Sequence, residues 1–126
     1  MELKVGMTYT AEDVVCEDNS AKKWGSGQLE VFATPAMVAL MEKAALNAVA
    51  PGLPEGSDTV GTEVNVSHSK ASGYGEIVRA TATLKEMDGR KLVFDVEAHD
   101  STGEIGRGTH TRFVIDTERF MAKLKK

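Results

Sequence analysis

The sequence predicts an α+β fold, in which one buried helix is followed by a mostly antiparallel sheet. Apolar residues recur at spacings of three and four through residues 31–50, which indicates a helix. From residue 59 onward, apolar and polar residues alternate in four successive stretches, which indicates strands. The dipeptides Asp88-Gly89 and Thr102-Gly103 separate three of these stretches, and Asp-Gly in particular favours a hairpin turn.

The predicted helix has a clear start and a clear end. Thr34 suits the N-cap, where its hydroxyl can accept from a backbone N–H of the first turn, and Pro35 suits the first helical position. Pro51 and Pro54 cannot continue the helix. Because the helix is apolar nearly all round, we expect it to be buried, with Glu42 as an exception in its middle.

The predicted strands differ in what their faces carry. In 59–68 the even-numbered residues share one face and the odd-numbered residues the other, so Gly61 is expected to face away from His68. Strands 76–86 and 90–100 each have one apolar face. In the last strand, 104–115, one face is small or polar: Gly106, Gly108, His110, Arg112 and Val114.

Weaker patterns complete the chain. Residues 8–15 suit a first strand, the polar stretch 16–28 suits a loop or lid with glycine hinges, and 29–32 suit a short strand. Residues 116–126 suit a short basic amphipathic helix whose apolar side chains can pack: Phe120, Met121 and Leu124. A sheet with one apolar face and one long helix to cover it is typical of the hotdog fold, in which a curled antiparallel sheet wraps around a central helix.

Composition narrows the classes of protein. A chain of 126 residues predicts a single domain, 1–126, and a formal charge of -4 argues against a nucleic-acid partner. The lone Cys16 allows no disulfide within the chain and suits a reducing compartment. Charged residues interrupt the apolar helix, so no membrane span is expected, and Met1–Gly6 has no apolar signal-peptide core. We expect a cytoplasmic protein without a membrane or nucleic-acid partner.

Three residues are candidates for chemistry, and each has a structural alternative. Glu42 in apolar surroundings is costly unless it is paired or functional, but it could share a solvent-facing stripe with Lys43. His68 extends an apolar strand face, where many histidines are simply hydrogen-bonded core residues. Thr34 is already explained as a helix cap.

Other polar residues give weaker signals. His99 and His110 lack a metal-ligand spacing such as H-E-x-x-H, so we expect neither a metal nor a cofactor. The remaining cations suit a solvated face, although a few could contact a nucleotide phosphate: Lys22, Lys23, Arg79, Arg90, Lys91 and Arg112.

Five short motifs, in the same order, resemble the fluoroacetyl-CoA thioesterase-like family of hotdog proteins over about residues 29–115. These are Val31–Thr34 running into Met37–Glu42, Thr59–His68, Asp88–Leu92, Ala98–Asp100 and Ile105–Arg112. The resemblance implies a homodimer that hydrolyses acyl-coenzyme A thioesters without metal. It implies that Thr34, Glu42 and His68 are catalytic. It also implies that Gly61 and Arg112 lie in the active site, and we predict that Phe32 contacts the substrate.

The segment before the Val-Phe-Ala-Thr motif departs from the family pattern. The fluoroacetyl-specific enzyme has a longer segment there with aromatic lid residues, whereas this chain reads Lys23-Trp24-Gly25-Ser26-Gly27-Gln28. We therefore expect a different short acyl group, with coenzyme A as part of the substrate.

Two catalytic schemes fit these residues. In one, Thr34 attacks the thioester, His68 takes its proton and Glu42 orients His68. In the other, Glu42 activates water or attacks directly. Eight helical residues separate Thr34 from Glu42 by about 12 Å, so either Thr34 lies before the helix and folds back or the site is shared between two subunits, and we expect the second. A non-catalytic acyl-CoA binding module is the alternative function, and hydration of an enoyl thioester is disfavoured because no hydratase Asp/His motif is present.

Overall fold

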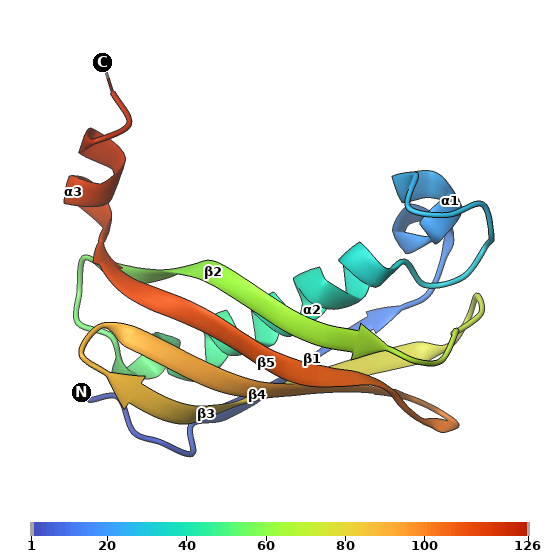
Figure 1. Ribbon diagram of the computed structural model, residues 1–126, viewed down its shortest axis with the longest axis horizontal. Helices are drawn as coiled ribbons and strands as arrows, with labels where there is room; N and C mark the ends of the chain where they lie inside the picture. The colour runs from blue at the N-terminus through green and yellow to red at the C-terminus, as the bar shows by residue number, and fades with distance from the viewer. Residues whose placement is uncertain (1, 126) are drawn as a thin grey trace.

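A computed structural model of the chain describes residues 2–125; Met1 and Lys126, the last residue of the predicted C-terminal helix, lie outside the described residues. Five strands form one antiparallel sheet in the order β1-β3-β4-β5-β2. Their bounds are β1 Thr8–Val14, β2 Ser57–His68, β3 Ile77–Asp88, β4 Lys91–Asp100 and β5 Gly103–Asp116. The sheet curls around the long helix α2 (Thr34–Val49), as Figure 1 shows. The predicted α+β architecture is confirmed.

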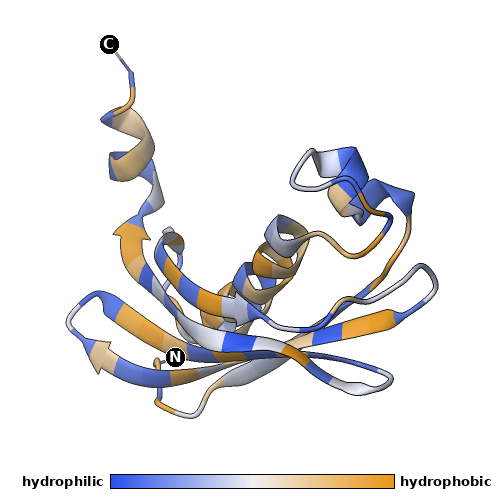
Figure 2. Ribbon diagram, turned by 45° about the vertical axis from the view of Figure 1, so that its right-hand side comes forward, coloured by the Kyte–Doolittle hydropathy of each residue, from blue (hydrophilic) through white to orange (hydrophobic). Residues whose placement is uncertain are grey.

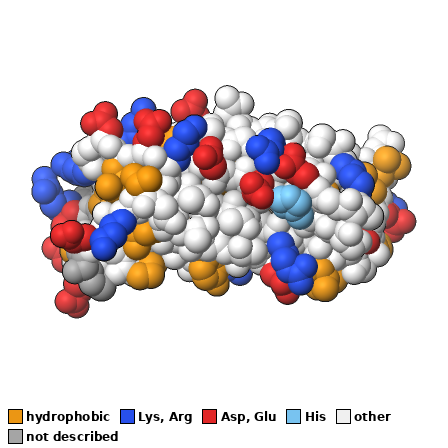
Figure 3. Space-filling model, turned by 90° about the horizontal axis from the view of Figure 1, so that it is seen from below, with side chains coloured by type: hydrophobic (Ala, Val, Ile, Leu, Met, Phe, Trp, Pro, Cys, Tyr) orange, Lys and Arg blue, Asp and Glu red, His pale blue; other side chains and the backbone are white. Residues whose placement is uncertain are grey.

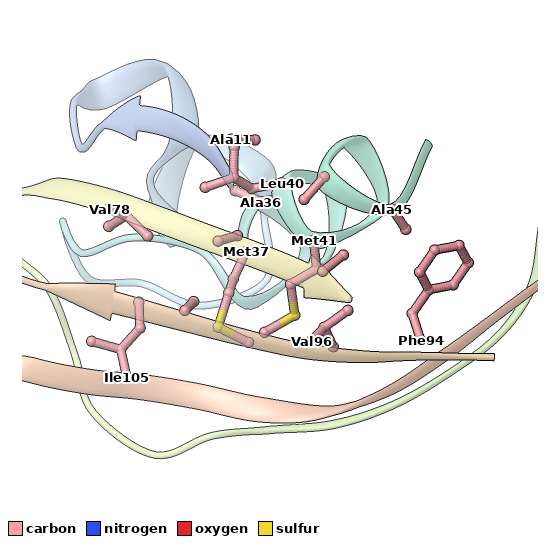
Figure 4. Close-up of a cluster of buried hydrophobic side chains, with 14 of the residues drawn as sticks. Ala11, Ala36, Met37, Leu40, Met41, Ala45, Val78, Phe94, Val96 and Ile105 are labelled. Carbon is pink, nitrogen blue, oxygen red and sulfur yellow. The ribbon is translucent and has the colours of Figure 1, made fainter. Parts of the chain in front are cut away.

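Helix α2 fills the hollow of the sheet with apolar side chains. Met37 and Met41 point from the helix into a cluster that includes Phe94, Val96 and Ile105 of the facing strands (Figure 4). Each large apolar side chain buried in this way stabilises the fold by about 1.5–3 kcal/mol. The predicted inward faces of β3 and β4 are confirmed, because Val78, Ala80, Ala82, Leu84, Leu92, Phe94, Val96 and Ala98 are all buried.

The small face of β5 has a packing reason. A Cβ added to Gly106 would lie 2.5 Å from the Ser67 carbonyl oxygen of β2 and 2.7 Å from Met37 Sδ, so the glycine leaves room for both β2 and α2. The hydrophobic positions of α2 and of the strands that face it form one buried cluster, and Figure 2 shows where such positions lie along the ribbon.

A bulge in β2 corrects the predicted pattern of faces. Gly61 pairs with Arg112 but Glu63 already pairs with Thr111, so the register shifts between them. The extra residue turns Gly61 to the same inward face as Val64 and His68. The prediction that Gly61 faces away from His68 was wrong.

Shorter segments also differ from their predictions. Residues 29–32 make only isolated bridges, Ser20 to Phe32 and Val31 to Gly73. The stretch 16–28 holds a 3-10 turn, η1 (Glu17–Asn19), and a short helix, α1 (Ala21–Trp24). A further 3-10 turn, η2 (Ala50–Gly52), follows α2.

The C-terminal helix α3 (Thr117–Ala122) forms as predicted but does not pack as predicted. It projects from the end of β5 in both Figure 1 and Figure 2, and none of its residues is buried. Phe120, Met121 and Leu124 are exposed. This helix and α1 lie at opposite ends of the long axis (Figure 1).

Strand β2 forms one edge of the sheet, and its outer side pairs with no other strand in residues 2–125. It is 12 residues long, and its inward-facing Val64 is 37% exposed. A long edge with exposed apolar residues is a template for pairing with another strand. By contrast, the convex face carries intermingled acidic and basic side chains (Figure 3), several of them paired, as Arg79 is with Glu12.

Candidate active site

Thr34 is the first residue of α2, and its hydroxyl is not a helix cap. The N-cap is Ala33, and no side chain caps the helix. Thr34 Oγ1 instead forms a 2.8 Å hydrogen bond with His68 Nδ1 at the end of β2. The predicted capping role was wrong, and the hydroxyl is held against an imidazole.

His68 is half-buried in surroundings that favour its neutral form. Burial lowers the pKa of His68 below the ordinary value, and the backbone of Lys70 opposes this only in part. The ring of Phe32 meets the imidazole edge-on with 6.5 Å between centroids. His68 Nε2 is buried and has no hydrogen-bond partner within residues 2–125. A neutral imidazole that accepts from Thr34 at Nδ1 carries its proton on this unpartnered Nε2.

A pocket of about 230 Å³ opens beside this pair. The segment before α2 covers one side of it, and the loop after β2 forms the other. Its lining residues are Ala21, Ser26, Val31, Phe32, Thr34, His68, Ser69, Lys70 and Ala71.

Asp100 fixes the loop that follows His68. Its carboxylate pairs with Lys70 Nζ at 3.1 Å and accepts from Ser72 Oγ at 2.7 Å and Thr102 Oγ1 at 2.7 Å. Burial acts to raise the pKa of Asp100, but the hydrogen bonds prevail and hold this pKa well below its usual range. An ionised carboxylate therefore anchors one wall of the pocket.

Glu42 belongs to a second cluster. Its Oε2 lies 3.9 Å from NH1 of the buried Arg112, while the Glu42 side chain itself is 41% exposed. A Cβ added to Gly61 would lie 2.8 Å from the same Oε2, so this glycine leaves room for the carboxylate. Glu42 forms no hydrogen bond with Thr34 or His68 in the described chain.

Arg112 is oriented by two neighbours. Its Nε donates to Thr59 Oγ1 at 2.8 Å and its NH2 donates to the Thr59 carbonyl at 2.9 Å. NH1 lies 3.2 Å from His110 Nε2, and His110 Nδ1 lies 2.8 Å from the carbonyl of Glu63. Since the guanidinium only donates, His110 must accept at Nε2 and donate from Nδ1. Burial lowers the pKa of His110, which agrees with this neutral form.

The predicted site residues therefore fall into two groups. Thr34, His68 and Phe32 meet at one end of α2, while Glu42, Gly61 and Arg112 meet along its middle. His110 and Thr59 also belong to this second cluster, although the sequence pattern marked His110 only as part of a polar strand face and gave Thr59 no role in the site. The available signal was that Thr59 shares a strand face with Gly61, and His110 shares one with Arg112. The β2 bulge hid the fact that these two faces lie on the same side of the sheet.

Comparison with known proteins identifies the family. A family model described as fluoroacetyl-CoA-specific thioesterase matches residues 15–118. The chain belongs to this family. A fluoroacetyl-CoA thioesterase from Streptantibioticus cattleyicolor is 47% identical over 97 residues, which are 77% of this chain and 70% of that protein.

Solved structures agree with this membership of the fluoroacetyl-CoA-specific thioesterase family. A fluoroacetyl-CoA thioesterase structure matches with a TM-score of 0.90 at 39% identity, covering 98% of this chain and 96% of that one. A thioesterase-superfamily protein from Thermus thermophilus matches with a TM-score of 0.88 at 27% identity, covering 96% and 90%. The predicted family, hotdog fold and thioester hydrolase class are confirmed.

In residues 2–125, no group of three or more His, Cys, Asp or Glu side chains is placed to hold a metal ion. No helix in this range is long and apolar enough to cross a membrane.

Proposed function

We propose that this protein hydrolyses a short-chain acyl-coenzyme A to the free acid and coenzyme A. The observation that carries the proposal is the 2.8 Å hydrogen bond between Thr34 and His68 in the wall of the pocket. The family relatives support the same reaction. The pocket, of about 230 Å³, is below the usual range for drug-sized ligands, which favours a small acyl group.

In the proposed reaction Thr34 is the nucleophile. His68 takes the hydroxyl proton as Thr34 Oγ1 bonds to the thioester carbon, the C–S bond breaks, and the proton returns to the departing thiolate. His68 then takes a proton from water as the water oxygen bonds to the acyl carbon, the ester bond to Thr34 Oγ1 breaks, and His68 returns the proton to Thr34 Oγ1. The backbone N–H groups of the first turn of α2 begin at Thr34 and can stabilise the oxyanion. The scheme needs no metal or separate cofactor, since coenzyme A enters as part of the substrate.

We also propose that Glu42 acts on His68 of a second protomer. Within one chain Glu42 lies away from Thr34, and His68 Nε2 has no partner in the described residues. Antiparallel pairing of two β2 edges with Gly61 opposite His68 of the second protomer would bring each Glu42 beside the other chain's imidazole. Arg112 and Gly61 would position that carboxylate.

The pairing predicts the effect of a charge at the centre of β2. With the bulge counted, Asn65 lies opposite its own copy at the twofold axis and Val64 lies opposite Val66 of the second protomer, so Val64→Asp buries an unpaired carboxylate among apolar side chains in this register. We expect a monomer without thioesterase activity, measured by light scattering and thiol release. Val14→Asp, on the opposite edge strand, is the matched control and should remain dimeric. A dimeric Val64→Asp protein, or an active monomer, would contradict the shared site.

Thiol release tests the reaction itself. The wild-type protein is assayed with acetyl-, fluoroacetyl-, propionyl- and longer acyl-coenzyme A, beside Thr34→Ala. We expect turnover of the shorter substrates by the wild type and at least a 100-fold lower kcat for Thr34→Ala. Binding of acyl-coenzyme A without turnover would refute hydrolysis and favour a binding module.

The lone Cys16, which is free and exposed, supports a reducing cytoplasm as the location.

A further inference from the structure

A second pocket lies at the base of α3, at the end of the molecule away from Thr34 and His68. Its volume is about 150 Å³, and its lining residues are Arg90, Ile115, Asp116, Arg119, Phe120 and Lys123. Arg90 comes from the β3–β4 turn, and its carbonyl accepts from the N–H of Val114 at 2.9 Å. The start of α3 is tied down by the Thr117 N–H, which donates to the Gly56 carbonyl at 2.9 Å.

The three cations of this pocket are unpaired within the described residues. None of Arg90, Arg119 and Lys123 has an acidic side chain within 4.0 Å in residues 2–125, whereas Arg79, Arg107 and Arg112 all have one. Asp116 is the one acid in the lining, and its Oδ1 accepts from the Arg119 backbone N–H at 3.0 Å. The pocket is therefore cationic in a chain with a formal charge of -4.

The pocket also has an aromatic wall. Phe120 is 36% exposed and lines it beside Ile115. Unpaired guanidinium and ammonium groups bind phosphate oxygens, and an exposed phenyl ring can stack on a nucleobase. We propose that this pocket binds the adenosine 3′-phosphate 5′-diphosphate end of coenzyme A. The inference rests on the proposed thioesterase function and on the paired β2 edges.

The dimer puts this pocket beside the second protomer's catalytic pair. Within one chain, the 12 residues of β2 separate this pocket from that chain's own Thr34 and His68 by about 36 Å. When Gly61 faces His68 of the other protomer, Ser57 lies four residues beyond that point, and Asp116 is its partner on β5. The offset along the strand is about 13 Å for four residues, and the offset across the sheet is about 10 Å, or two strand spacings from the other protomer's β2 to β5. Together they place the pocket about 16 Å from the second protomer's His68.

That span fits the substrate. About thirteen bonds join the sulfur of coenzyme A to its first phosphorus, which corresponds to about four extended residues or about 15 Å. A thioester at Thr34 of one protomer can therefore extend its pantetheine arm to the cations of the other.

The double variant Arg119→Ala/Lys123→Ala tests the pocket, with Arg79→Ala/Arg107→Ala as a control that removes two arginines from other surface positions. We expect the KM for acetyl-coenzyme A to rise at least about tenfold in the test variant, with kcat within about twofold of wild type. The KM for acetyl-pantetheine, which lacks the phosphates, should stay unchanged. The control should match wild type with both substrates.

Calorimetric titration with 3′,5′-ADP separates this inference from the proposed function. Binding by wild type and its loss in the test variant would support the pocket even if no acyl-coenzyme A were hydrolysed. Hydrolysis by wild type with an unchanged KM for acetyl-coenzyme A in the test variant would overturn the pocket and leave the function standing. An equal rise in KM for acetyl-pantetheine would also overturn it, because the cations would then act on structure.

Discussion

Gly61→Ala is a small change at the point where Glu42 is positioned. The added Cβ would lie 2.8 Å from Glu42 Oε2, 3.0 Å from His110 Cε1 and 3.2 Å from Arg112 NH1. The imidazole and the guanidinium are held by hydrogen bonds, whereas the carboxylate ends a flexible side chain. Glu42 is therefore the group that moves.

The distances give the size of the effect. The carboxylate must retreat by about 0.6 Å to restore an ordinary contact of 3.4 Å. Because a misplacement of 1 Å can cost about 100-fold in rate, we expect kcat to fall about tenfold. Stability should hardly change, since Gly61 is exposed and alanine costs the unfolded chain conformational entropy worth about 0.4–1 kcal/mol.

The assay is thiol release at saturating substrate, together with the thermal unfolding midpoint. Gly73→Ala is the matched control, because a Cβ at Gly73 would meet nothing within 4 Å. A Gly61→Ala protein that is folded and has the kcat of Gly73→Ala would refute the idea that the position of Glu42 matters for catalysis.

Two further predictions concern ionisable groups. Burial lowers the pKa of His68 in the single chain, whereas a Glu42 carboxylate at Nε2 would raise this pKa. The His68 pKa measured by NMR should therefore be lower in the Val64→Asp monomer than in the wild-type dimer, and equal values would contradict the shared site. Asp100→Asn should lower the free energy of unfolding at pH 7 by about 1–3 kcal/mol, because the charge that Lys70 and three donors satisfy is gone. This loss of stability should shrink as the pH drops below 3.8 towards the lower folded-state pKa of Asp100. Asp95→Asn is the control and should show no such loss, because its carboxylate is exposed.

Features that depend on local sequence could be predicted. The turn at Asp88-Gly89 joins β3 to β4, with Gly89 at φ 61°, because the dipeptide itself favours that geometry. The inward faces of these strands follow from simple alternation. The buried helix α2 follows from its apolar spacing.

Features that depend on distant partners could not be predicted from pattern. Thr34 has a hydroxyl suited to a cap, but a histidine 34 residues away engages it. The bulge after Gly61 depends on pairing with β5, and it decides whether Gly61 faces Glu42. The apolar residues of α3 fit an amphipathic pattern, but no element of the described chain covers them.

The central claim is that each site takes Thr34 and His68 from one protomer and Glu42 from the other. Thr34→Ala and Glu42→Gln chains, each inactive alone, are co-expressed and assayed by thiol release. A shared site leaves one intact site in each mixed dimer, so random pairing should restore about a quarter of wild-type activity per protomer. If the mixed dimers form and remain inactive, the three residues act within one chain and the shared site is wrong.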